Sequence, residues 1–277
     1  MTTSAAISAA ALALREAEVL LVGAGAGIGV DSGLPDFRGD QGFWNAYPPY
    51  EKLGLTFVDA ANPEHFGDDP AFGWGFYGHR LGLYRATVPH AGFALLRRWA
   101  EARGLASFVF TSNVDGQFQK AGFDPARVAE VHGSIHHLQC AGPCTEAIWE
   151  NREEVPVDLA TMRARAIPRC PRCRGVARPN ILMFGDFGWI PDRSTKQGEA
   201  FDAFLEEHRG RRTVIIELGA GKAIPSVRVK AERLAQRPGV VLVRINPREA
   251  DGPKGTISIP AGALEGLGAI QAELDAG

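Results

Sequence analysis

Residues 19–38 read VLLVGAGAGIGVDSGLPDFR, and this stretch gives the first indication of both fold and ligand. Its apolar run at 19–22 has the length of a buried strand, and glycines follow at positions 23, 25, 27 and 29. A strand that ends in glycines lets a diphosphate approach bare backbone N–H groups at the start of a helix. The strict fingerprint G-x-G-x-x-G is not met, because Ile28 and Val30 interrupt it. The glycines alone therefore leave an ordinary strand-to-helix turn as open as a nucleotide site.

The bulk composition is that of a globular protein. With 277 residues the chain can bury a substantial core, and 45% hydrophobic and 22% charged residues are ordinary proportions. A net charge of −2 gives no reason to expect nucleic-acid or membrane binding, and no apolar run approaches the roughly 20 residues of a membrane helix. The Ala-rich start lacks the basic region of a signal peptide, so we expect a first helix there and a cytoplasmic protein.

Short apolar runs alternate with helical patterns along most of the chain. Runs typical of buried strands lie at 18–22, 107–111, 128–131, 180–184, 213–218, 240–245 and 256–259, and helical patterns lie at 90–103, 198–209, 225–236 and 263–275. Runs of Val, Ile and Leu without alternation are typical of strands buried on both faces. The pattern predicts an α/β fold with a Rossmann-like, doubly wound parallel sheet, whose ligands bind beyond the carboxyl ends of the strands.

Residues 39–89 break this alternation and are rich in Gly, Pro and aromatic residues. One interpretation is a small helical subdomain with its own core. The other is a mobile flap over a cofactor, in which Phe37, Phe43, Trp44 and Tyr47 close against the ligand. The two interpretations are compatible, because a lid needs apolar faces to exclude water.

The four cysteines of the chain form two close pairs, C-x3-C and C-x2-C, at Cys140, Cys144, Cys170 and Cys173. Two such pairs supply the four thiolates of a tetrahedral zinc site, which we prefer to two disulfides or four unrelated core cysteines. Four protein ligands leave no open coordination position, so one structural zinc per chain is predicted. A nucleic-acid-binding zinc ribbon is disfavoured, because acidic residues offset the nearby arginines.

Two polar motifs follow predicted strands. Residues 111–116 read TSNVDG, which alone is consistent with a turn and helix cap, and residues 130–134 read EVHGS. Together with the opening stretch they resemble the signatures of the sirtuin family of NAD-dependent protein deacylases, bacterial type with a four-cysteine zinc module. The resemblance includes GAGIGVDSGLPDFRG, SNVDGQFQKAG, EVHGS, RPNILMFGD at 178–186, ELGAG at 217–221 and RIN at 244–246, and it runs from residue 18 to residue 246.

The resemblance implies roles for particular residues. His132 would be the general base, and Asn113 and Asp115 would line the pocket for nicotinamide and its ribose as catalytic residues. The segment at Phe184-Gly185 would grip the substrate backbone. The implied NAD-binding set is Gly25, Ala26, Gly27, Asp36, Phe37, Arg38, Ser112, Asn113, Asp115, Gly219, Ala220, Gly221 and Asn246.

The resemblance also implies an activity and an organisation. The activity is NAD-dependent removal of acyl groups, acetyl above all, from protein lysine, with release of nicotinamide and O-acyl-ADP-ribose. We expect one catalytic domain over 1–277. Its Rossmann-like part would cover 15–38, 90–134 and 180–277, with a helical cofactor-loop insertion at 39–89 and a zinc module at 135–179. An acylated-lysine protein would be the partner, and neither membrane nor nucleic acid is expected.

Several positions depart from the family pattern. The family's usual residues are replaced by Gly29, Ser112, Ala220-Gly221 and Asp186. These changes leave open an alternative activity, ADP-ribosyl transfer or NAD hydrolysis on the same fold. A non-enzymatic NAD sensor is disfavoured, because pure binding does not require the base His132. An ordinary dehydrogenase is disfavoured by the incomplete fingerprint.

Overall fold

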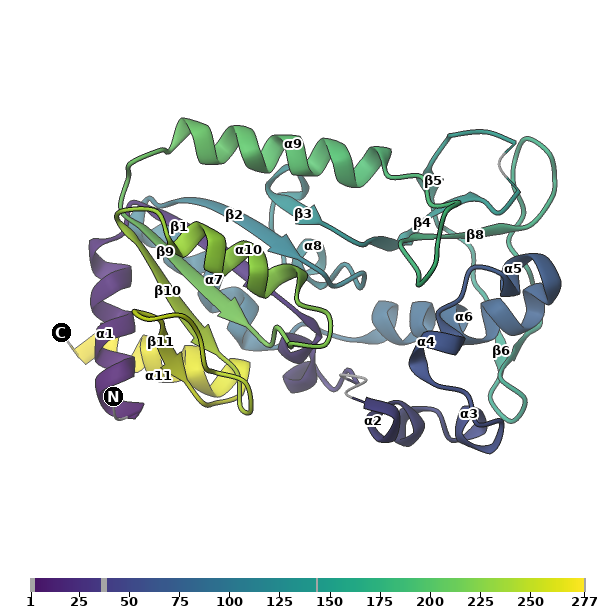
Figure 1. Ribbon diagram of the computed structural model, residues 1–277, viewed down its shortest axis with the longest axis horizontal. Coiled ribbons are helices and arrows are strands. Elements are labelled where there is room, and N and C mark those ends of the chain that lie inside the picture. Colours follow the sequence, from purple (N-terminus) through teal and green to yellow (C-terminus); the bar gives the residue numbers. More distant parts are fainter. Residues whose placement is uncertain (1–2, 36–38, 143, 277) are drawn as a thin grey trace.

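The computed structural model describes residues 3–35, 39–142 and 144–276, and within them six strands form one parallel sheet (Figure 1). The spatial order is β11-β10-β9-β1-β2-β3. These strands are β1 (Val19–Ala24), β2 (Ala106–Thr111), β3 (Val128–Glu130), β9 (Thr213–Leu218), β10 (Val240–Ile245) and β11 (Ile257–Ile259). Counted along the chain, this is the 3-2-1-4-5-6 order of a doubly wound fold, as predicted. The order reverses between β1 and β9, and a crevice is expected beyond the carboxyl ends of these two strands.

Helices cover both faces of this sheet, which explains the unbroken apolar runs (Figure 1). Leu20 and Val22 of β1 belong to the core that includes α1 (Thr3–Glu16), α7 (Ala91–Arg103) and α11 (Ala263–Ala276). Val19 and Leu21 face the other core, which includes α9 (Asp192–Glu207) and α10 (Ser226–Ala235). Every residue of β1 is buried, because successive side chains enter opposite cores.

A second, mixed module lies at the other end of the molecule (Figure 1). Its sheet has the order β5-β4-β8, from β4 (Gly133–Cys140), β5 (Trp149–Glu150) and β8 (Ala177–Ile181), and β6 (Val157–Asp158) pairs with β7 (Arg163–Ala164). Its helices are α2 (Gly39–Ala46), α3 (Pro48–Lys52), α4 (Phe57–Ala60), α5 (His65–Asp68) and α6 (Pro70–Ala86). The connecting elements of the chain are η1 (Ala26–Ser32), α8 (Gln117–Lys120) and η2 (Pro125–Arg127).

The aromatic residues of 39–89 form the core of this module. Phe43 and Tyr47 are buried, with ring centroids 5.5 Å apart. The indole of Trp74 on α6 donates a hydrogen bond to the carbonyl of Ala177 on β8, at 2.8 Å. Burial of Phe43 and Tyr47 favours the interpretation of residues 39–89 as a helical subdomain. These two rings are part of its core, so they are not free to close over a cofactor as the flap interpretation expected.

One strand prediction needs correction, and one long strand was missed. The strand expected at 180–184 is β8, which spans 177–181 and pairs antiparallel with β4 instead of joining the parallel sheet. Its partner β4 was not predicted, because the sequence GSIHHLQC is too polar to be recognised as a buried strand. In the structure β4 is the central strand of its sheet and pairs with both β5 and β8. Within the described residues, no helix has both the length and the apolar character needed to cross a bilayer.

Candidate active site

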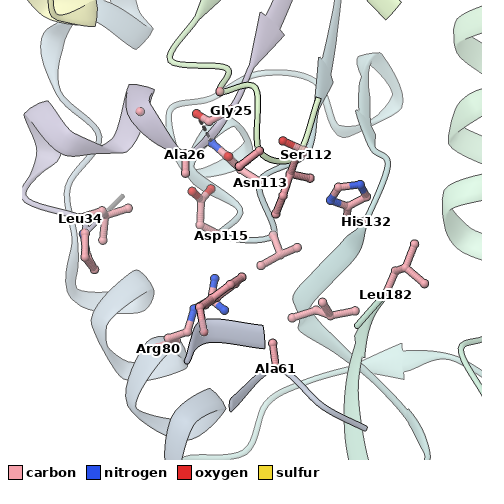
Figure 2. A pocket seen from close by; sticks show the side chains of 18 of the residues that line it. Gly25, Ala26, Leu34, Ala61, Arg80, Ser112, Asn113, Asp115, His132 and Leu182 are labelled. Carbon is pink, nitrogen blue, oxygen red and sulfur yellow. Dashed lines mark hydrogen bonds between the residues drawn. The ribbon is translucent and has the colours of Figure 1, made fainter. Parts of the chain in front are cut away.

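A cavity of about 720 Å³ opens at the carboxyl ends of the parallel strands (Figure 2). Residues that follow β1, β2, β3 and β9 form one part of its wall, and the second module forms the other. The predicted site residues on the wall are Gly25, Ala26, Gly27, Ser112, Asn113, Asp115, His132, Gly219 and Gly221. The fold therefore gathers in one cavity residues that are almost 200 positions apart in the sequence.

The glycines after β1 allow two loops to touch through their backbones. Gly25 N donates to the carbonyl of Leu218 at 3.0 Å, and Gly27 N donates to that of Gly219 at 3.1 Å. A Cβ atom on Gly25 would lie only 2.7 Å from the Cα of Ala220, so a side chain has no room. The short helix η1 begins directly afterwards, and Ala26 and Gly27 at its start line the cavity. The two loops thus bring closely packed backbone to this part of the cavity wall.

Asn113 and Asp115 are held by the turn that follows β2. The side-chain amide of Asn113 donates to the carbonyl of Gly25 at 3.1 Å, which joins this turn to the glycine loop (Figure 2). The carboxylate of Asp115 accepts a hydrogen bond from Gln117 N at 2.9 Å. Burial raises the pKa of Asp115 to about 6, and the nearby charge of Glu130 acts in the same direction. Asp115 therefore changes protonation state just below neutral pH.

His132 lies across the cavity from Leu34, just after β3 (Figure 2). The glycine that follows it is required, because Gly133 has φ +82° and a Cβ there would meet the carbonyl of Asn180 at 2.1 Å. Burial lowers the pKa of His132, while a hydrogen bond to the backbone of Ser112 acts in the opposite direction. The imidazole is thus neutral at neutral pH and available as a base.

The wall on the β9 side is carried by a loop that two arginines hold in place. Arg228 donates to the carbonyl of Glu249 at 2.7 Å. Arg244 is fully buried and pairs with Glu217 on the neighbouring strand, at 2.6 Å from Nε to Oε1. Lys222 and Glu249 line the cavity there, and neither was predicted from the sequence.

Some predicted residues are placed elsewhere. Ala220 is absent from the cavity wall, and so is Asn246, which is buried and donates to the carbonyl of Ala220 at 3.0 Å. The contact of Asn246 with the adenosine ribose stays a prediction. Asp36, Phe37 and Arg38 lie outside the described residues.

The second module contributes the segment that the resemblance linked to the substrate, together with one residue that was not assigned. Leu182, Met183 and Phe184, which belong to RPNILMFGD, line the cavity just after β8. Asp186, in the place of the family's glutamate, forms a buried ion pair with Arg178. Arg80 on α6 also lines the cavity, and its Nε donates to the hydroxyl of Tyr84 at 2.9 Å. Arg80 was not assigned because its neighbours in the sequence are mostly aromatic and indicate a core. The signal that could have identified it is its positive charge within that apolar segment.

The four cysteines come together as predicted. Their sulfur atoms all lie within 4.8 Å of one another, with Cys140 and Cys173 at 3.7 Å and Cys144 and Cys170 at 3.6 Å. A tetrahedron with metal–sulfur bonds of about 2.3 Å has edges of roughly 3.8 Å, so the donor set fits zinc. The cluster lies away from the cavity wall and uses four protein ligands, which makes it a structural site.

Comparison with known proteins agrees with this geometry. Residues 25–204 match the model of the Sir2 family, which is more than half of the chain. The chain belongs to the Sir2 family. It is 33% identical over 223 residues to an NAD-dependent protein deacylase of Aeropyrum pernix, which covers 80% of this chain and 78% of that protein. It is 32% identical over 243 residues to NAD-dependent protein deacylase 1 of Pseudomonas aeruginosa, covering 85% of each.

Solved Sir2 structures share the fold. A structure of Sir2 enzymes described for their mechanism and regulation has a TM-score of 0.69 and 25% identity, and covers 98% of both chains. A Sir2 homologue in complex with NAD has a TM-score of 0.71 and 24% identity, and covers 96% of this chain and 93% of that one. The Sir2 fold thus extends over nearly all of the chain.

We expect Asn113→Ala to separate a catalytic from a structural role. Loss of one hydrogen bond to Gly25 should cost about 1 kcal/mol of folding free energy and move the melting temperature by only a few degrees. If Asn113 positions nicotinamide, nicotinamide release should fall roughly 100-fold.

Thr111→Val is the matched control. The Thr111 hydroxyl holds the same turn, because it accepts a hydrogen bond from Asn113 N at 3.1 Å and donates one to the carbonyl of Ala24 at 2.8 Å, but Thr111 does not line the cavity. Near wild-type nicotinamide release in Asn113→Ala would assign Asn113 to the structure of the turn alone.

Proposed function

We propose that this protein removes acyl groups from lysine side chains of proteins in a reaction that consumes NAD. The observation that carries the proposal is the cavity that unites the glycine loop, Asn113, Asp115 and His132. Relatives at 32–33% identity that bear the name NAD-dependent protein deacylase support it. NAD supplies the ADP-ribosyl group that accepts the acyl group and leaves with it as O-acyl-ADP-ribose.

Different residues of the chain would bind the diphosphate, orient the nicotinamide end and accept the proton. The glycine loop at 25–27, with Gly219 and Gly221, would hold the diphosphate. Asn113 and Asp115 would orient the nicotinamide end. His132 would take a proton from a ribose hydroxyl, which is a task suited to an imidazole that is neutral at neutral pH. Proximity must supply much of the rate, because an acyl-lysine amide oxygen is a weak nucleophile.

The remaining assignments extend this proposal. Asp36, Phe37, Arg38, Ser112, Ala220 and Asn246 complete the proposed NAD-binding set. One catalytic domain spans 1–277, with the helical insertion at 39–89 and the zinc module at 135–179. A cytoplasmic location is consistent with four cysteines that are arranged for a metal.

The decisive experiment is incubation with NAD and acyl-lysine peptides, followed by mass detection. We expect one nicotinamide and one O-acyl-ADP-ribose for each lysine released, and no product when either reactant is omitted. The panel should include acetyl-lysine and an acyl chain that ends in a carboxylate, because the guanidinium of Arg80 lines the cavity and favours a negative charge.

The alternative activities give different products. NAD cleavage that proceeds equally well without peptide would identify a hydrolase. ADP-ribose attached to the peptide would identify a transferase. Either result would contradict the deacylase proposal.

A further inference from the structure

His132 has a side-chain partner that belongs to none of the sequence motifs. Its Nε2 lies 3.1 Å from the hydroxyl oxygen of Ser226, which is 94 positions further along the chain. Ser226 is the first residue of α10, and it follows the loop that leads from β9 past Gly221 and Lys222. The contact therefore joins the β3 side of the cavity to the β9 side.

The helix that carries Ser226 is firmly anchored. Val227, Ala231 and Leu234 of α10 are buried against the parallel sheet. Arg228, two residues after Ser226, donates to the carbonyls of Glu249 and Asp251, each at 2.7 Å. The backbone of Ser226 thus has a fixed position, although the residue itself is exposed.

The role of each ring nitrogen depends on the tautomer. A neutral imidazole has one donor and one acceptor nitrogen. With the proton on Nδ1, Nε2 is the acceptor that faces the hydroxyl of Ser226 and the atom that can take a proton. We take this tautomer as the reactive one.

We propose that Ser226 is a positioning residue for His132, which holds the imidazole in place through Nε2 and stabilises the imidazolium formed by proton uptake. In the ligand-free protein the Ser226 hydroxyl donates to Nε2. The single lone pair of Nε2 accepts one proton, so the ribose hydroxyl replaces Ser226 as the donor when substrate binds. After proton transfer, Nε2–H donates to the Ser226 oxygen, whose own hydrogen has turned away. Hydrogen bonds to charged groups are stronger than those between neutral groups, so the imidazolium gains more. This inference rests on the proposed role of His132 as general base.

The electrostatic setting explains why such a partner is useful. The amino end of α10 carries a partial positive charge, which disfavours an imidazolium beside it. Burial acts in the same direction on the pKa of His132. The hydroxyl oxygen of Ser226 acts against both effects, because it can accept a hydrogen bond from the imidazolium and so favours the charged form. The other titratable side chains on the cavity wall are Tyr77, Arg80, Tyr84, Asp115, Lys222 and Glu249.

The test compares Ser226→Ala with Ser226→Thr, which restores the hydroxyl. In Ser226→Ala we expect kcat for deacylation to fall about 10-fold, and nicotinamide exchange to stay within about 2-fold. The acid limb of the pH–rate profile should move to lower pH by about 0.5–1 unit, because the imidazolium loses a partner. The threonine variant should restore both values. Val229→Ala, at an exposed position of the same helix, is the control and should behave as the wild type.

Two further measurements make the outcome decisive. In a His132→Ala background, Ser226→Ala should cause no further loss, because its effect passes through the imidazole. NMR titration of His132 in the ligand-free protein should show a lower pKa in Ser226→Ala, a readout that does not depend on any activity.

Several results would overturn the inference. These are an unchanged His132 pKa, equal losses of exchange and deacylation, and a full additional loss in the His132→Ala background. Failure of the wild type to form O-acyl-ADP-ribose would instead contradict the proposed function, and the NMR titration would still decide the contact between Ser226 and His132.

Discussion

Replacement of His132 by alanine should lower deacylation by about 10²–10⁴-fold, while labelled nicotinamide still exchanges into NAD in the presence of acyl peptide. The reason is that the two halves of the reaction have different needs. Cleavage of the nicotinamide bond requires no base, because the acyl oxygen attacks without losing a proton. The later step requires a deprotonated ribose hydroxyl, and it loses its proton acceptor in this variant.

Exchange and deacylation should be measured on the same preparation, with folding checked by thermal melting. His65→Ala is a suitable control, because this half-buried histidine bonds the carbonyl of Asp59 and does not line the cavity. If exchange and deacylation fall together while the fold stays intact, His132 mainly positions substrate and is not the general base.

Loss of the metal site should have the largest effect on stability. Removal of one thiolate from a four-cysteine zinc site takes away folding free energy that the bound metal supplies. For Cys170→Ala we expect less than half an equivalent of bound zinc and a melting temperature lower by about 10 °C or more. Deacylation should weaken as well, because β8 runs from the cysteine cluster to Leu182 and Met183 on the cavity wall.

Arg169→Ala, at the exposed position just before Cys170, is the matched control and should keep both zinc and stability. Metal should be quantified on protein with reduced cysteines. Wild-type protein that contains less than about half an equivalent of zinc per chain would contradict the prediction.

The central features of the fold were predictable because they depend on local patterns. The parallel sheet follows from unbroken apolar runs such as TVIIEL, which bury both faces of a strand. His132 was recognisable because it follows a buried run and precedes a glycine, and the structure explains that glycine through the contact of Gly133 with Asn180. The cysteine cluster followed from spacing alone.

The missed features depend on contacts between distant segments. Ser226 meets His132 only because the start of α10 lies beside the residues that follow β3, and no local sequence pattern predicts that contact. Arg80 lies on a helix whose aromatic neighbours indicate a core, so its place on the cavity wall was not visible. Strand β4 was missed because its sequence GSIHHLQC is largely polar, and because its partner β8 lies in a distant part of the chain.

The attachment of the second module has a mechanical consequence for the base. The β-sheet part of the module leaves and rejoins the rest of the chain through two adjacent strands, with Gly133 paired to Ile181 and Leu182 N bonded to the carbonyl of His132 at 3.0 Å. If the module rotated relative to the parallel sheet, these residues would form the hinge. The displacement of an atom in such a rotation grows with its distance from the hinge. The cysteine cluster would therefore move a long way, while His132 would hardly move. The imidazole would therefore keep its place if such a motion changed the width of the substrate cleft.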